Sequence, residues 1–174
     1  QVKAELDSYD QFQFSGNEDW LLRDNENFFG VAADGSWGYD PIHDAPEPPT
    51  GPGNYVKLFF DHPEWDEWVT HFTEDIVLED DDFFSTNLTQ WDITVQADVP
   101  GTTTLRFHVE TGSVPENYEM YVSCDNDGDG ENDYTRISHY DETSISFYMD
   151  GSGQQDLSVF IGNIAPQAPD NLQS

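Results

Sequence analysis

The sequence predicts an all-β protein, an antiparallel β-sandwich of the jelly-roll or immunoglobulin-like type. In several short runs, apolar residues recur at every second position, which is the period of a half-buried strand. Clusters of Gly, Pro, Asp and Asn separate these runs, as turns do. A third feature is a Pro- and Gly-rich segment, residues 34–53. It cannot form a central strand, and we expect it to cross one edge or end of the sandwich as an ordered strap.

The second half of the chain shows the alternation most clearly, because each of its apolar runs places its large side chains on one face. The single cysteine falls in this inward set, so it is expected to act as a small hydrophobic core residue. The predicted inward residues are Trp91, Ile93, Val95, Ala97, Leu105, Phe107, Val109, Tyr118, Met120, Val122, Cys124, Ile145, Phe147, Met149, Leu157, Val159 and Ile161.

The first half is less regular. Residues 2–14 and 20–32 are expected to form strands, with a turn at residues 24–27, and residues 55–60 resume the alternation. The aromatic residues between positions 62 and 75 fall at helical spacing, which allows one short helix there.

Residues 1–164 are predicted to form a single β-sandwich domain, because a chain of 174 residues can bury one core but is short for two. Residues 165–174 have a Pro-x-x-Pro spacing and are expected to be a linker or a C-terminal exchange segment. At the other end, alternating apolar residues give the segment 1–7 one apolar face. This segment is therefore a candidate strand for donation to a neighbouring copy of the chain.

The charge of the chain restricts its partners. Five Lys and Arg against 36 Asp and Glu give a formal net charge of -31, which repels phosphate backbones and anionic headgroups and favours cations. Because of this charge we do not expect nucleic-acid binding. No apolar run approaches the roughly 20 residues that span a bilayer, so we do not expect membrane insertion either. A first residue of Gln1 rather than Met suits a mature secreted chain, and we expect an extracellular or cell-surface location.

Residues 125–133, between two predicted strands, carry the clearest candidate site, a D-x-D-x-D-G pattern. This spacing wraps oxygen ligands around Ca²⁺, with the glycine at the sharp turn. Without a cation the carboxylates would repel one another, whereas a divalent ion would bind between them. The expected ligands are the side chains of Asp125, Asp127, Asp129 and Asp133 and the main-chain carbonyl of Glu131.

The match to a helix-loop-helix calcium site is partial. The twelfth position, where a bidentate Glu is expected, is Arg136, and the flanking residues are predicted strands. The final ligand would therefore come from elsewhere, with Asp141 or Glu142 as candidates. The alternative is a solvated acidic turn in a salt-adapted protein, since acidic residues are spread over the whole chain. A second acidic run, residues 79–82, is interpreted as a solvated bend or a weak second site.

The usual catalytic motifs are absent from the sequence. There is no Gly-x-Ser-x-Gly, no phosphate-binding loop and no His-Glu-x-x-His, and the five histidines are scattered. Glu64 and Glu67 beside two tryptophans could form a glycosidase pair, but such neighbours arise by chance in so acidic a chain. We therefore expect a protein that is not an enzyme.

The main alternative is a carbohydrate-binding module with structural calcium, because exposed aromatic rings stack on sugars. Burial under the strap is the expectation for these rings, since large aromatic side chains usually serve burial. A coplanar exposed row would reverse that expectation. The rings available for a carbohydrate site or an interface are Trp20, Trp37, Tyr39, Trp65 and Trp68.

The order of "FFGVAADGSWGYDPIHDAPEPPTGPGNYVKLFFDHPEW", "WDITV", "PENYEMYVSCDNDGDG" and "LSVFIG" resembles a β-sandwich module of bacterial secreted and cell-surface proteins. The resemblance runs from about Phe28 to Gly162. Such modules lie beside immunoglobulin-like or fibronectin type III domains and carry no established catalysis, so the resemblance implies a structural role. This chain departs from them in its acidity and its long Asp-rich hairpin. The signature of the resemblance is the strap, with Asp34, Gly35, Tyr39, Asp40 and Pro46 to Pro49.

These features predict an extracellular, non-catalytic structural module, or a subunit of a surface assembly or filament, that Ca²⁺ stabilises. The expected partners are copies of the chain itself or neighbouring surface-protein domains. Glycans are the partners under the carbohydrate-binding alternative.

Overall fold

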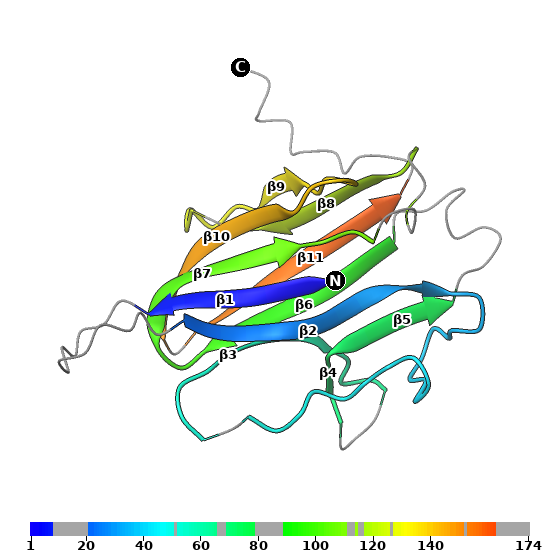
Figure 1. The fold of residues 1–174 in the computed structure, drawn as a ribbon, viewed down its shortest axis with the longest axis horizontal. Coiled ribbons are helices and arrows are strands. Elements are labelled where there is room, and N and C mark those ends of the chain that lie inside the picture. The colour runs from blue at the N-terminus through cyan, green and yellow to red at the C-terminus, as the bar shows by residue number, and fades with distance from the viewer. Residues whose placement is uncertain are drawn as a thin grey trace.

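The computed structural model describes residues 1–8, 21–50, 52–65, 69–78, 89–110, 114, 117–125, 127–151 and 153–162. Within them, eleven strands form two sheets stacked as a β-sandwich, which confirms the predicted fold class (Figure 1). No helix among these residues is long and apolar enough to cross a membrane. The strands are β1 (Val2–Ser8), β2 (Leu21–Ala32), β3 (Val56–Asp61), β4 (His71–Phe72), β5 (Glu74–Leu78), β6 (Thr89–Ala97), β7 (Pro100–Phe107), β8 (Glu119–Cys124), β9 (Asp133–Arg136), β10 (Thr143–Asp150) and β11 (Gln154–Gly162).

The two sheets differ in size and in strand direction. The first sheet has five strands in the order β10-β7-β1-β2-β5, and the second has six in the order β4-β3-β6-β11-β8-β9. All paired strands are antiparallel except β2 and β5, which run parallel. The parallel pair arises because the chain leaves β2, passes through the strap and two strands of the second sheet, and returns to the first sheet at β5.

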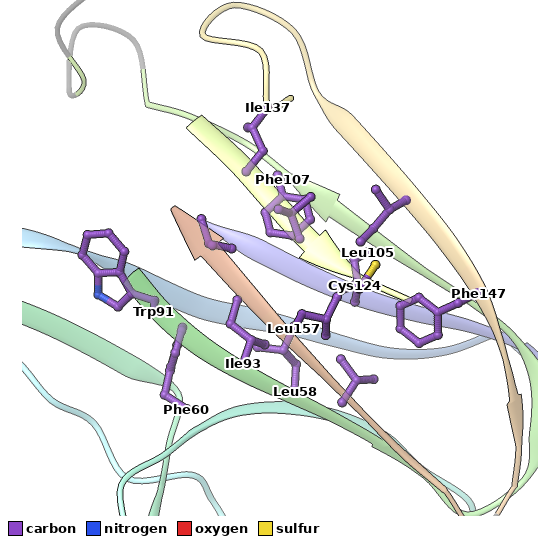
Figure 2. Packing of buried hydrophobic residues seen from close by; sticks show 14 of the residues in the cluster. Leu58, Phe60, Trp91, Ile93, Leu105, Phe107, Cys124, Ile137, Phe147 and Leu157 are labelled. Carbon is purple, nitrogen blue, oxygen red and sulfur yellow. The ribbon is translucent and has the colours of Figure 1, made fainter. Parts of the chain in front are cut away.

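The core lies between the sheets and is built from the alternating faces that the sequence predicts. Of the predicted inward residues, Val109 and Tyr118 are partly buried against the core and all the others are buried. Figure 2 shows Leu105 of the first sheet facing Leu58 and Leu157 of the second. Each large apolar side chain buried here stabilises the fold by roughly 1.5–3 kcal/mol.

Cys124, at the end of β8, is buried in this core, as predicted. Burial raises the pKa of its thiol to about 11, and the nearby carboxylates of Asp133 and Asp125 act in the same direction. Since the thiolate is the reactive form of cysteine, this side chain is expected to be chemically inert at neutral pH.

Strand β2 runs without a break through residues 24–27, so the predicted turn there is wrong. A bulge in the register with β1 accommodates these polar residues. Asp24 uses one carboxylate oxygen to accept a hydrogen bond from the Leu58 amide of β3, at 2.7 Å, and the other to accept one from Asn27, at 2.8 Å. The polar residues therefore link the two sheets instead of reversing the chain.

The strap crosses the side of the sandwich that β4 and β5 form, as the sequence predicted. Its anchor is the buried side chain of Asp44. One oxygen of this carboxylate accepts a hydrogen bond from the Ile76 amide of β5, at 3.1 Å, and the other accepts one from Asp40 within the strap, at 2.6 Å. Pro46 forms a β-bridge with Phe72 of β4. The strap therefore covers an edge strand of each sheet.

The short helix allowed between residues 62 and 75 is absent from the described part of that segment. The chain instead forms a hairpin in which Phe60 pairs with Phe72 and the His62 amide donates a hydrogen bond to the Thr70 carbonyl, at 2.7 Å. The helical spacing of the aromatic residues is overridden because pairing with β3 satisfies the backbone and buries Phe72 completely.

Several predictions fall outside the described residues. They concern the acidic run 79–82, the side chains of Trp20, Glu67 and Trp68, and the C-terminal segment 165–174.

Candidate metal centre

The acidic hairpin, residues 125–132, connects β8 to β9 at one edge of the six-stranded sheet. The two strands pair from Tyr121↔Arg136 to Cys124↔Asp133, so the loop is closed by a short ladder. Residues 127–132 are exposed. The fold therefore presents the D-x-D-x-D-G sequence on a two-stranded base at the surface.

Three carboxylates of this hairpin converge. Asp125, Asp127 and Asp129 each offer an oxygen atom, and these atoms lie within 4.8 Å of one another. Asp125 also accepts hydrogen bonds from the amides of Gly128, at 2.7 Å, and Gly130, at 2.9 Å. Both glycines have positive φ angles, 81° and 89°, which fold the loop back over Asp125. Hard oxygen ligands in such a loop fit Ca²⁺.

The other predicted ligands are not brought into this group. Asp133 lies in β9 and is not among the three clustered carboxylates. Arg136, at the twelfth position, donates a hydrogen bond to Glu119 at 3.0 Å, and Glu142 accepts one from Arg106 at 3.0 Å. Asp141 is likewise outside the cluster. Among the described residues, three carboxylates could therefore hold a cation together, and the carbonyl of Glu131 stays a predicted main-chain ligand.

The aromatic residues proposed for a carbohydrate or interface site lie near the strap. Trp37 is 57% exposed and Tyr39 is 37% exposed, so the expected burial under the strap is wrong for these two rings. Tyr39 packs against Phe72, with 5.4 Å between ring centroids, and its plane is tilted by 30° from that of Trp65. The two neighbouring rings are therefore not a coplanar platform.

Trp65 is only partly exposed, and one of its faces is occupied. The imidazole of His62 stacks on it with 3.6 Å between centroids and 2° between planes. His62 is also held between the carboxylates of Glu64 and Asp75, each 3.0 Å from a ring nitrogen. Burial lowers the pKa of His62, but the hydrogen bonds to the two carboxylates outweigh burial and raise it above its ordinary value. Trp65 therefore packs against the His62 ring, which the two carboxylates hold in place.

One acidic pair was not predicted from the sequence. Glu47 of the strap and Asp24 of β2 line an open pocket of about 590 Å³ together with Lys57. The pKa of Glu47 is raised to about 7, first by burial and then by the charge of Asp24, while the charge of Lys57 opposes this shift. One carboxylate oxygen of Glu47 is buried without a hydrogen-bond partner. No local motif marks this pair, because its members come from segments far apart in the chain.

Glu47 gives the fold a specific pH dependence. Because its pKa is raised from 4.5 to about 7, the folded chain holds a proton that the unfolded chain releases between these values. This group therefore destabilises the fold progressively as pH rises through that window. Glu47→Gln is expected to raise the melting temperature at pH 8 and leave it unchanged at pH 4. After allowance for partial exposure the gain is about 1 kcal/mol, or about 2–4 °C.

Calorimetry in the presence of a chelator measures this effect. Glu131→Gln, which removes the same charge from an exposed position, controls for general charge repulsion. Equal stabilisation by both variants at pH 8 would mean that overall charge, and not the environment of Glu47, sets the effect.

Comparisons with known proteins add nothing to this geometry: no family model, no curated protein and no solved structure matches the chain. The resemblance to modules of bacterial surface proteins therefore stays a prediction. The function has to be argued from the fold and from the residues described above.

Proposed function

We propose that this protein is a non-catalytic structural module that assembles with copies of itself on the outside of the cell. In this proposal, assembly occurs by exchange of the first strand, and Ca²⁺ stiffens the acidic hairpin. The observation that carries the proposal is the position of β1. This strand lies inside a sheet, between β7 and β2 (Figure 1).

The pairing of β1 explains why exchange would work. Its backbone pairs with β7 from Val2↔Phe107 to Ser8↔Gly101 and with β2 along its other side. Removing β1 would leave two strands with unpaired edges facing one gap, and the same segment of another copy would fit that gap with the same pairing. A strand exchanged between identical chains costs little, because the contacts made are those that were lost.

The acidic hairpin supports the second part of the proposal. A cation bound between Asp125, Asp127 and Asp129 would relieve the repulsion among them and would bind the folded loop better than the unfolded chain. The charge of -31 also favours an environment rich in cations, such as the outside of a cell. No catalytic step is proposed, because the sequence carries no catalytic motif.

Assembly can be tested on the purified chain by size-exclusion chromatography with light scattering and by electron microscopy. We expect species larger than a monomer, and we expect chelation of calcium to weaken them. A chain that stays monomeric with calcium and with chelator, over a wide range of concentrations, would refute the assembly proposal.

Calcium binding gives a separate prediction. Ca²⁺ at about 100 times its dissociation constant is expected to stabilise the fold by about 2.7 kcal/mol, or about 5–10 °C in melting temperature. Asp127→Asn is expected to remove most of this shift, whereas Glu131→Gln, whose side chain is not a proposed ligand, should keep it. A shift that requires bulk salt and does not saturate at about one ion per chain would instead indicate general screening.

The exposure of Trp37 and Tyr39 favours carbohydrate binding as a second candidate function. Binding on a glycan array that disappears on Trp37→Ala and persists in the Asp127→Asn variant would support this candidate. Absence of binding to every glycan would refute this candidate.

A further inference from the structure

The sheet edges of this sandwich are protected unequally. An edge strand exposes unpaired N–H and C=O groups to other chains, so proteins usually shorten, charge or cover it. The edge at β5 is covered by the strap, through the hydrogen bond from Ile76 to Asp44. The edge at β4 has only two residues and is bridged by Pro46. The edge at β9 has four residues, begins with a charged residue and ends with another, and adjoins the acidic hairpin.

The fourth edge, β10, is neither short nor covered by a described segment, and its one charged residue, Asp150, is its last. It has eight residues and pairs with β7 without a register shift, from Thr143↔Phe107 to Asp150↔Pro100. Among the described residues no strand pairs with its outer side, and Figure 1 shows it at the margin of the first sheet. It contains no proline, no lysine and no bulge. It is therefore a long, regular and open edge.

The charge along β10 is the second unusual feature. Asp and Glu make up 36 of the 174 residues, yet residues 143–149 contain no charged side chain. The inward side chains belong to the core, and the outward ones, Ser144, Ser146 and Tyr148, are exposed and neutral. Two copies of so acidic a chain repel each other over most of their surface, but at β10 they can approach closely.

We propose that β10 pairs with β10 of a second copy, antiparallel, so that the first sheets of two molecules join into one continuous sheet. A strand edge is complementary to itself, and a two-fold axis needs only one such surface on each partner. Pairing centred on Ser146 sets Ser144 opposite Tyr148 of the other copy and keeps the apolar residues of both strands on the core side. This interface lies two strands away from β1 and does not depend on strand exchange.

The ends of the strand determine how the interface responds to salt. The same register brings Glu142, which is paired with Arg106 of its own copy, opposite Asp150 of the other copy at both ends. Like charges placed opposite each other destabilise a strand pair. Salt screens this repulsion and the repulsion between the two acidic molecules. Association through β10 is therefore expected to strengthen as NaCl rises from 0.05 to 0.5 M (about 14 Å to about 4 Å in screening length).

A cysteine placed at the centre of the strand tests the pairing directly. In the full chain, Ser146→Cys is expected to form a disulfide-linked dimer under mild oxidation, because the two substituted positions face each other across the two-fold axis. Thr102→Cys lies on the exposed face of β7, one strand further in, and should not cross-link. The parent chain is the second control, because its Cys124 is buried. Equal cross-linking of both variants, or none of Ser146→Cys, overturns the proposal.

Charge placed on the edge provides an independent measurement. Ser146→Asp is expected to weaken dimerisation at least tenfold in sedimentation equilibrium, whereas Thr102→Asp, which adds the same charge one strand away, should change it less than threefold. Both positions are exposed, so both variants should keep the melting temperature of the parent within a few degrees. A parent chain that sediments as a monomer at millimolar concentration in 0.5 M NaCl, or a dimer that Ser146→Asp leaves intact, refutes pairing through β10.

Discussion

A chain that lacks residues 1–8 is expected to lose its cooperative fold, and a synthetic peptide of residues 1–8 added in trans is expected to restore it. The truncation removes β1 and with it the ladders to both β7 and β2, which splits the five-stranded sheet in two. The remaining edges would face a gap in the middle of the five-stranded sheet, where buried backbone groups without partners cost about 1–3 kcal/mol each. The loss is comparable with the whole stability of a domain, about 5–15 kcal/mol.

Circular dichroism and calorimetry with increasing peptide measure the recovery. The matched control is the same peptide with Glu5→Pro, because β1 has neighbours on both sides and proline removes a backbone donor from an interior strand. We expect recovery with the native peptide and none with the proline peptide. A truncated chain that melts cooperatively at the temperature of the full chain would show that β1 is dispensable, and exchange of β1 could then not drive assembly.

The strands that are easiest to predict are those whose pattern is local. Trp91, Ile93 and Val95 alternate with polar residues, and this alternation alone predicts which face of β6 is buried. The pairing of strands is not a local property, and the alternation does not predict which strand lies beside which. The pairing of β1 with β7, or of β2 with β5, depends on how the two sheets share one core. Patterns within short segments of sequence carry no information on that arrangement.

Local sequence preferences caused both errors in the predicted strands. Residues 24–27 have the composition of a turn, but Asp24 is needed to bind the Leu58 amide, so the chain stays extended. The aromatic spacing after residue 62 indicates a helix, but the pairing of Phe60 with Phe72 decides the structure. In both places a bond between distant segments outweighs the local preference.

The candidate site also has features that the local sequence predicts and features that it does not. The cluster of Asp125, Asp127 and Asp129 could be predicted because its geometry is encoded in one short loop. The position of Asp133, which lies apart from these three, depends on where the ladder between β8 and β9 begins. Neither the stacking of His62 on Trp65 nor the burial of Glu47 has a local signal, since tertiary packing creates both.

The corner between β10 and β11 carries the second large prediction. Gly151 has a φ of 85°, and a side chain there would meet the backbone of the β6–β7 corner. Its Cβ would lie 2.6 Å from both the carbonyl carbon of Val99 and Cδ of Pro100, and closer still to the nitrogen of Pro100. Both corners carry the chain from one sheet to the other, so neither can move without disturbing the sandwich. Gly151→Ala is therefore expected to destabilise the fold by about 2–5 kcal/mol, or roughly 10 °C in melting temperature.

The loss in Gly151→Ala has two causes, the positive φ angle and the contact between the two corners. The variant Gly128→Ala separates them. Gly128 has nearly the same φ, 81°, but a Cβ there meets nothing within 4 Å. Measured by calorimetry in the presence of a chelator, it should show only the cost of the backbone conformation, about 1–2 kcal/mol. The remainder of the loss in Gly151→Ala then measures the contact between the corners. Equal losses in the two variants would mean that the corners separate at little cost.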